Sequence, residues 1–183
     1  MSTQAVAGAA AGAALLGGGG TLAAYAAGAF NSKDKDWQDT TFKDYAAHLN
    51  FKYIGETGTT APGTLPTKEK IKTKIDGDST GIGYKKSLKD NWENMKVGDV
   101  DESSKSKRPT GDVSTLFPAD NNLSEKEKIS EWTEEWCKAI ANKKVKAKLT
   151  KNNQTEWNTN LFEGDVSWKA FKEVCLEATV NLG

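Results

Sequence analysis

The stretch DGDSTG, residues 76–81, has the residue types of the first half of an EF-hand calcium loop. Asp76 and Asp78 would supply carboxylate ligands, Thr80 a hydroxyl group, and Gly81 the sharp turn. The second half of the motif fails, because Ser87 stands where a bidentate Glu should complete the ligand shell. We therefore favour an ordinary Asp–Gly turn over a calcium loop and expect no metal site.

The glycines in GDSTGIGYKKS only superficially suggest a phosphate loop. The stretch lacks the Gly-Lys-Ser/Thr ending of a Walker motif, and no third glycine follows Gly81 and Gly83 at the dinucleotide-binding spacing. No strand is expected before it either. We therefore expect no nucleotide and no other cofactor.

Acid–base or nucleophilic catalysis would depend on His48, the only histidine. A Ser-His-Asp or Cys-His site is formally open, but a lone His beside Leu49 on a helix favours a structural or exposed role. A zinc site would need further His or Cys nearby. Glu134 and Glu135 lie among solvated helix residues and form no isolated pair. We expect no catalytic residues and a protein that is not an enzyme.

Cys137 and Cys175 are the only cysteines and lie far apart in the sequence. In an exported chain they would close one disulfide loop, which contributes ~3–4 kcal/mol in the loop-entropy model. The alternative is two buried free thiols on helix faces. If their helices pack antiparallel, a bridge is geometrically reasonable. The choice between the two depends on export.

Two helices are expected in the C-terminal part. The first begins at Ser124, which forms a capping-box pattern with Glu127, and the second spans residues 165–180 with Asp165 as its cap. Both have apolar faces at helical spacing, which we expect to lie in the core. These faces comprise Ile129, Trp132, Trp136 and Ile140 in the first helix, and Trp168, Phe171, Val174, Cys175 and Ala178 in the second.

The remaining chain shows weaker patterns. Helical spacing predicts a helix over residues 34–50 and two short helices over 68–75 and 84–95. Loops are expected near residues 55–67 and 97–123, the second one disordered or held only by Leu116 and Phe117. The lysine-rich run KKVKAKLTK, residues 143–151, is interpreted as the solvated end of a helix, which would touch anionic lipid if it were cytoplasmic.

The fold class that follows is mostly α. Residues 1–32 would form an N-terminal membrane or signal helix, and residues 33–183 a small irregular helical bundle with long polar loops and few or no strands. The 25 basic and 25 acidic residues cancel, which argues against a nucleic-acid partner. Arg108 is the only arginine, which further weakens any phosphate-binding interpretation.

Residues 5–30 carry no charged side chain and exceed the roughly twenty residues of helix that a bilayer core requires. Ala and Gly predominate, and small residues recur four apart, as in Gly8 and Gly12, a spacing that permits close helix packing in lipid. No basic n-region precedes them, yet residues 24–26 and 27–29 have the small-x-small form of a cleavage site. An uncleaved anchor is favoured over a cleaved signal, and both over an Ala/Gly tail outside the membrane.

The stretches AVAGAAAGAALLGGGGTLAAYAAGAF, LKDNWENM, ISEWTEEWCKAI and VSWKAFKEVC, in a lysine-dominated polar chain, resemble the paralogous uncharacterised proteins of hemotropic mycoplasmas. The resemblance covers most of the chain in layout. It implies a surface or membrane-tethered protein of a wall-less bacterium, in a family that varies for immune evasion or host contact. It supplies no catalytic residue, cofactor or ligand. The two cysteines also do not fit an ectodomain with many disulfides.

The expected function is therefore that of a non-enzymatic, membrane-anchored surface protein with a role in host interaction or antigenic variation. Its partners would be the membrane, through residues 5–30, and an unidentified protein or host surface. The alternative is a secreted helical binding module from which the N-terminal segment has been removed. By the positive-inside rule, Lys33 and Lys35, which follow the apolar run, nominally place the body in the cytoplasm. The resemblance to mycoplasma surface proteins instead implies that the body lies outside the cell.

Overall fold

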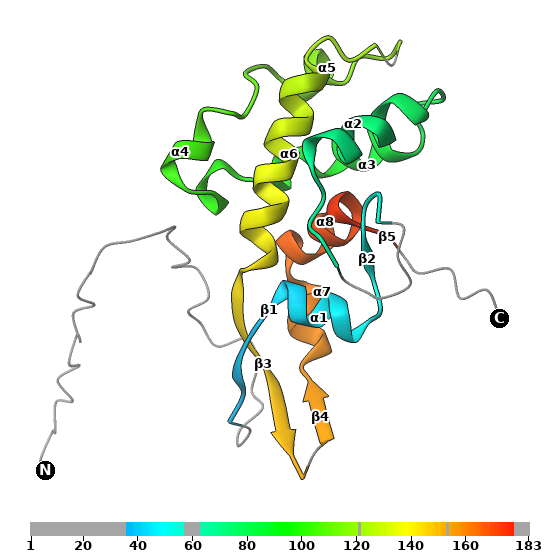
Figure 1. The fold of residues 1–183 in the computed structure, drawn as a ribbon. Helices are drawn as coiled ribbons and strands as arrows, with labels where there is room; N and C mark the ends of the chain where they lie inside the picture. Colours follow the sequence, from blue (N-terminus) through cyan, green and yellow to red (C-terminus); the bar gives the residue numbers. More distant parts are fainter. Residues whose placement is uncertain (1–35, 57–62, 121, 153, 178–183) are drawn as a thin grey trace, which may run out of the picture.

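Helices and two small antiparallel sheets share one core in this protein (Figure 1). The computed structural model describes residues 36–56, 63–120, 122–152 and 154–177. The elements, in chain order, are β1 Gln38–Thr41, α1 Phe42–His48, β2 Lys52–Tyr53, α2 Lys68–Gly77, α3 Tyr84–Asn91, the 3-10 turns η1 Trp92–Asn94 and η2 Val97–Asp99, α4 Glu102–Lys105, α5 Val113–Leu116, α6 Lys126–Ala141, β3 Lys144–Lys151, β4 Gln154–Trp157, α7 Thr159–Gly164, α8 Val166–Cys175 and β5 Leu176–Glu177.

The larger sheet has the strand order β1-β3-β4, and both of its pairs are antiparallel. The smaller sheet consists of two residues each from β2 and β5. The prediction of a mostly α helical bundle is therefore wrong, and the fold is a mixed helix–sheet one.

The error lies chiefly in the lysine-rich run KKVKAKLTK, most of which forms strand β3 and not a helix end. Val145, Ala147 and Leu149 point into the protein, while Lys144 and Lys146 between them are exposed. This alternation with period two is the pattern of a strand with one buried face. The sequence predicts a helix end here because lysines are also favoured at the C-termini of helices.

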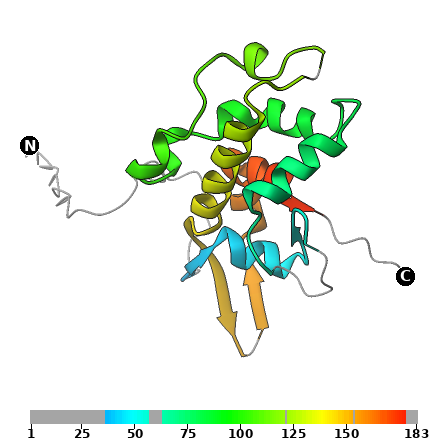
Figure 2. The same ribbon diagram turned by 45° about the horizontal axis from the view of Figure 1, so that its top comes forward.

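Helix α6 runs through the middle of the molecule, and β3 continues from its C-terminal end into a β3–β4 hairpin that projects away from the helices (Figures 1 and 2). Helices α2 and α8 both pack against α6. Trp132 and Trp136 are fully buried on α6, which confirms that its aromatic face belongs to the core. Burial of such large side chains is the main stabilising contribution available to this chain.

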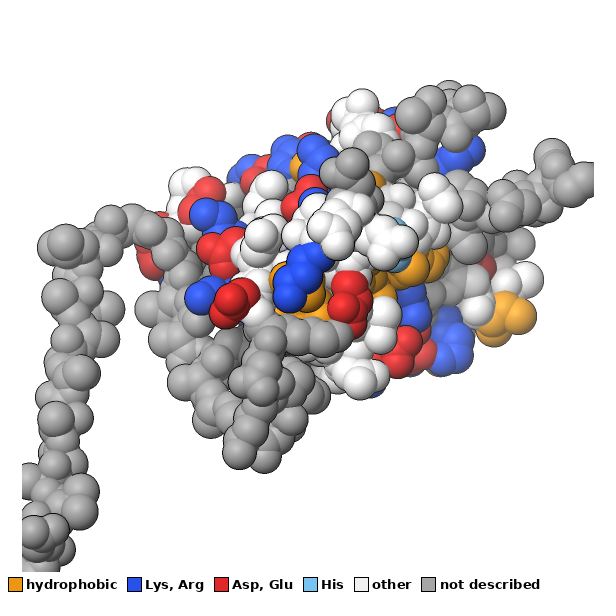
Figure 3. Space-filling view, turned by 90° about the horizontal axis from the view of Figure 1, so that it is seen from below, with side chains coloured by type: hydrophobic (Ala, Val, Ile, Leu, Met, Phe, Trp, Pro, Cys, Tyr) orange, Lys and Arg blue, Asp and Glu red, His pale blue; other side chains and the backbone are white. Residues whose placement is uncertain are grey.

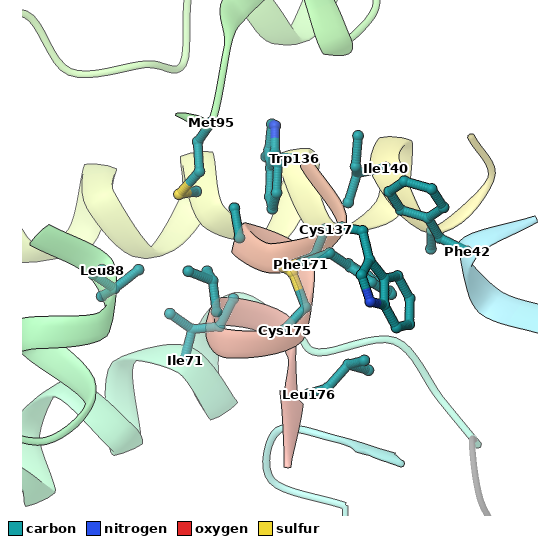
Figure 4. Packing of buried hydrophobic residues seen from close by; sticks show 14 of the residues in the cluster. Phe42, Ile71, Leu88, Met95, Trp136, Cys137, Ile140, Phe171, Cys175 and Leu176 are labelled. Carbon is teal, nitrogen blue, oxygen red and sulfur yellow. A yellow bond between two sulfur atoms is a disulfide. The ribbon is translucent and has the colours of Figure 1, made fainter. Parts of the chain in front are cut away.

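A disulfide joins Cys137 of α6 to Cys175 of α8, with their Cα atoms 5.8 Å apart. Both cysteines have no exposed surface and lie among the hydrophobic side chains drawn in Figure 4. The bridge therefore ties the two longest apolar faces of the fold together inside the core, and it closes a loop with a sequence separation of 38.

The N-terminal cap of α8 is the predicted one, whereas that of α6 is not. Asp165 caps α8 by accepting hydrogen bonds from the N–H groups of Ser167 and Trp168, which confirms that prediction. The capping box expected at Ser124 is absent, because the N-cap of α6 is Glu125, one residue later, and its side chain makes no cap hydrogen bond. A capping box exists instead at the start of α1, between Thr41 and Asp44.

The helix expected over residues 34–50 is shorter, because residues 38–41 form β1 and α1 covers only Phe42–His48. Helix α8 ends at Cys175, where Leu176 and Glu177 pair with β2. Its predicted extension to residue 180 lies outside the described residues beyond 177. The two short helices are present as α2 and α3.

The loop expected over residues 97–123 contains η2, α4 and α5, and more than Leu116 and Phe117 holds it. Val100 and Ser104 are also buried, and Trp136 donates a hydrogen bond from Nε1 to Asp99 Oδ2 at 2.9 Å. In the loop expected near 55–67, the described residues 55–56 and 63–67 form neither helix nor strand.

No helix within the described part of the chain is long and apolar enough to cross a membrane. The apolar segment predicted as an anchor, residues 1–32, lies outside the described residues.

Candidate functional site

The two carboxylates of the EF-hand-like stretch are held by different protein groups. Asp76 lies in the last turn of α2 and pairs with Lys72, 2.9 Å away, and with Lys126 of α6. Hydrogen bonds from Lys126 and Lys72 lower the pKa of Asp76 to about 2. Both partners are cations, so this carboxylate is neutralised without a metal ion.

Asp78 closes the turn itself. Its two oxygens accept the N–H groups of Gly81 at 2.9 Å, Gly83 at 3.0 Å and Lys85 at 2.9 Å. Burial opposes ionisation, but these donors prevail and the pKa of Asp78 lies below its ordinary value. Among the described residues, no group of three His, Cys, Asp or Glu side chains is arranged to hold a metal ion. The Asp–Gly turn is the interpretation that the geometry favours.

His48 is exposed at the end of α1 and makes ring contacts only with aromatic side chains. Its ring stacks on Trp157 at 5.0 Å and on Tyr45 at 6.0 Å. Within the described ranges, no hydrogen bond joins His48 to a serine, a cysteine or a carboxylate. The arrangement lacks the base–nucleophile contact that catalysis by a histidine requires.

Glu134 and Glu135 each serve a separate structural contact. Glu134 Oε2 accepts the N–H of Lys68 at 3.0 Å and so satisfies the first turn of α2. Glu135 accepts a hydrogen bond from Ser104 at 3.0 Å and pairs with Lys107 at 3.1 Å, which attaches α4 to α6. These two carboxylates therefore fix neighbouring elements, and both also pair with Lys138, at 2.7 and 3.6 Å.

Arg108 is a structural residue that sequence reasoning missed. Its guanidinium lies 5.0 Å from the Trp92 ring centroid and 5.4 Å from that of Trp132. It donates to the Trp92 carbonyl at 3.0 Å and to the Met95 carbonyl. Burial lowers the pKa of Arg108. The only arginine of the chain thus uses its guanidinium for contacts within the fold, which leaves it poorly placed to bind a phosphate ligand.

Lys143 and Asp165 form an ion pair with little exposed surface where α6, β3 and α8 meet. Lys143 Nζ lies 2.7 Å from Asp165 Oδ2 and 5.0 Å from the ring centroid of Phe42. The side chains are 9% and 2% exposed, respectively. This first residue of the lysine-rich run is therefore part of the core architecture, unlike the lysines that follow it.

Three of the four lysines of β3 form a row on the outer face of the three-stranded sheet. We call this row the lysine face and define it by Lys144, Lys146 and Lys148. Lys144 and Lys146 are exposed and Lys148 is half-buried. Opposite them stand Thr41, Asp39 and Trp157 on the neighbouring strands. Residues directly opposite in an antiparallel pair share a face of the sheet.

An aromatic stack borders the lysine face at Trp157. Lys148 Nζ lies 5.7 Å from the Trp157 ring centroid, and His48 stacks on the same indole. Tyr45 and Phe162 continue the stack inward, with ring centroids only 3.7 Å apart. Figure 3 shows the histidine, in pale blue, beside hydrophobic side chains at the molecular surface.

A second surface feature is a groove beside α3, of about 340 Å³. Its apolar side includes Phe117, Pro118 and Ile82, and the Ile82 side chain is 76% exposed. Lys86 and Asp90 in its wall pair with each other, and Lys85 and Lys89 also line the groove. The lysine face is the stronger candidate, because its three lysines are aligned on one face of a single strand.

Comparisons with protein-family models, with curated proteins and with solved structures found no match for this chain. Function must therefore be argued from its own residues. The signal that would have revealed the lysine face is the alternation Lys-Val-Lys-Ala-Lys-Leu in residues 144–149.

Proposed function

We propose that this chain is a non-enzymatic cell-surface protein, in which residues 5–30 insert into the membrane and the disulfide-linked body lies on the outer side. Its role would be contact with a host or another external partner. The observation that carries the proposal is the disulfide between Cys137 and Cys175 in the core. Disulfides of this kind persist in oxidising compartments and are rare in the cytosol.

The sequence of the opening segment supports the membrane part of the proposal. Residues 5–30 carry no charge and are long enough to cross the hydrocarbon region. An oxidised body then calls for a topology opposite to the one suggested by Lys33 and Lys35, whose influence is weak with only two charges. The resemblance in layout to surface proteins of hemotropic mycoplasmas points in the same direction.

The use of the candidate catalytic residues supports a binding role over an enzymatic one. In the part of the chain that the structure describes, Asp76, Asp78, Glu134 and Glu135 are each engaged by lysines, a serine or backbone N–H groups. His48 is stacked between aromatic rings. A surface-display role needs none of these groups to react.

Protease shaving of intact cells that make the protein tests this proposal. We expect the body to be digested on intact cells while a cytosolic marker survives, and both to be digested after permeabilisation. Mass measurement of the released body without reductant should show the oxidised cysteine pair. A body that resists protease until permeabilisation would exclude surface display.

A secreted form of the same body is the second candidate. The small-x-small triplets at residues 24–26 and 27–29 favour it, since signal peptidase cleaves after such triplets. N-terminal sequencing of the mature protein separates the two. A start near residue 27 or 30 would exclude the anchor, whereas retention of residues 5–30 would exclude secretion.

A further inference from the structure

We infer that the lysine face of β3 rests on anionic lipid headgroups of the membrane into which residues 5–30 insert. The inference requires that the leaflet facing the body carry anionic lipid, as the cytoplasmic leaflet does. The inference rests on the proposed membrane anchor and adds a second contact, with lipid headgroups as the partner. Its basis is the placement of Lys144, Lys146 and Lys148 on one face of β3, which pairs with β1, the first described strand of the chain.

The spacing of the three lysines suits a flat, charged partner. Alternate residues of a strand lie on one face and are separated by ~7 Å, so the three ammonium groups form a row about 13 Å long. The β3–β4 hairpin projects away from the helical body (Figures 1 and 2). On the side of Lys148, Trp157 packs against Tyr45 and His48 of α1, so Lys144 and Lys146 are the most exposed lysines of this face.

The described part of the protein does not neutralise the charge of the lysine face. Among the described residues, no carboxylate lies within ion-pair distance of Lys144, Lys146 or Lys148. Asp39 stands opposite Lys146 in the sheet, so the face keeps an excess of positive charge. Many lysines of the helical body are instead paired, among them Lys72, Lys107, Lys126 and Lys138.

If residues 5–30 lie in the membrane, the short connection to β1 keeps the bilayer within reach of this face. Eight residue steps separate Phe30, at the end of the apolar run, from Gln38, which begins β1. Fully extended, such a segment spans at most ~29 Å. Strand β1 pairs directly with β3, and therefore the tether enters the body at the sheet that bears the lysines.

Trp157 adds a group that suits the membrane interface. It stands opposite Lys148 on the same side of the sheet and is half-buried. Indole rings are enriched at the headgroup level, where an apolar ring meets polar surroundings. A nucleic acid fits less well, because the chain has no net positive charge and its single arginine, Arg108, is engaged by Trp92 and Trp132.

Flotation of the full chain with lipid vesicles tests the inference and the anchor separately. The chain is mixed with vesicles of phosphatidylcholine alone or of phosphatidylcholine with phosphatidylglycerol. We expect flotation with the neutral vesicles and a stronger partition into the anionic ones. Each lysine near an anionic surface increases partition about fivefold, so the three together give an increment of roughly a hundredfold, reduced by added salt.

The variant K144Q/K146Q/K148Q should lose most of this increment and keep its partition into neutral vesicles. A matched variant, K89Q/K169Q/K172Q, removes three exposed lysines from α3 and α8 with the same change in net charge and should retain the increment. Circular dichroism spectra of both variants show whether the fold is preserved, which we expect because all six side chains are at least partly exposed.

Three outcomes would overturn the inference: equal partition of the native chain into both vesicles, an increment that survives K144Q/K146Q/K148Q, or tighter binding to soluble polyphosphate than to anionic vesicles. The proposed anchor fails on different grounds, namely absence of flotation with neutral vesicles. A chain that floats only with anionic vesicles, and only with its three lysines, would remove the anchor and leave the lysine face in place.

Discussion

Lys143 Nζ lies 2.7 Å from Asp165 Oδ2, and this contact joins the end of α6 to the cap of α8. Asp165 uses its other oxygen to accept the N–H groups of Ser167 and Trp168. One carboxylate therefore holds a helix start and a lysine at the same time. Neither charged side chain is more than 9% exposed.

Replacement of Lys143 by methionine should destabilise the protein by ~3–5 kcal/mol, because it leaves a buried carboxylate without its cation. Urea unfolding followed by circular dichroism measures the change. Lys144→Met is the matched control, because Lys144 is the next residue and its side chain is exposed. Its effect on the free energy of unfolding should stay within about 0.5 kcal/mol. Equal effects of the two substitutions would contradict the structural role of the pair.

Reduction of the Cys137–Cys175 bridge should lower the free energy of unfolding by ~2–5 kcal/mol. The bridge restricts the unfolded chain, and its loss removes that restriction. Urea titrations with and without reductant give the difference. The double variant C137A/C175A serves as the control, since reductant should leave its stability unchanged; a reductant effect on that variant would assign the loss to another cause.

The Arg108→Lys substitution should cost about 1–3 kcal/mol although it keeps the charge. A single ammonium group cannot both stack between Trp92 and Trp132 and donate to the carbonyls of Trp92 and Met95. Thermal unfolding measures the loss. The neighbouring Lys107→Gln variant, which breaks half-buried ion pairs with Glu131 and Glu135, should cost less than about 1 kcal/mol.

The substitution Asp78→Ala should cost about 1–2 kcal/mol, because three N–H groups of the turn lose their acceptor. Calcium should not alter the stability of the native chain, since backbone N–H groups of the turn already bind both oxygens of this carboxylate. Chemical unfolding of both forms with and without calcium tests the two statements. A rise in the stability of the native chain with calcium, absent in the variant, would revive the EF-hand interpretation.

Asp76 should make stability depend on pH in the acid range. Its pKa falls from 3.8 in the unfolded chain to about 2 in the folded one, so its contribution is fully present above pH 3.8 and is lost as the pH falls towards 2. Stability measured across this range should decline less steeply in Asp76→Asn than in the native chain. Parallel declines would show that Lys72 and Lys126 do not hold the carboxylate in solution.

Local patterns in the sequence predict a large part of the helical core. The apolar faces of α6 and α8 repeat with the period of a helix, and Asp165 precedes α8 at the position of a cap. Both signals act between residues a few positions apart, so a linear chain displays them. The burial of Trp132, Trp136, Trp168 and Phe171 follows from the same periodicity.

The strands were harder to predict. The alternation in β3 is present in the sequence, but its lysines are equally typical of a helix end. β2 and β5 are only two residues each and exist because Lys52 and Tyr53 meet Glu177 and Leu176 across the fold. Segments that short have no periodicity from which a strand could be recognised.

Sequence by itself therefore determined the main helices, their buried faces and the apolar, uncharged character of residues 5–30. Only the tertiary structure decided which charged residues are committed inside the protein and which remain on its surface. Lys143 and Lys144 are adjacent and chemically identical, yet one lies against Asp165 and the other is exposed. The reason is physical: the environment of a charge depends on groups that are distant in sequence, and folding alone brings them within reach.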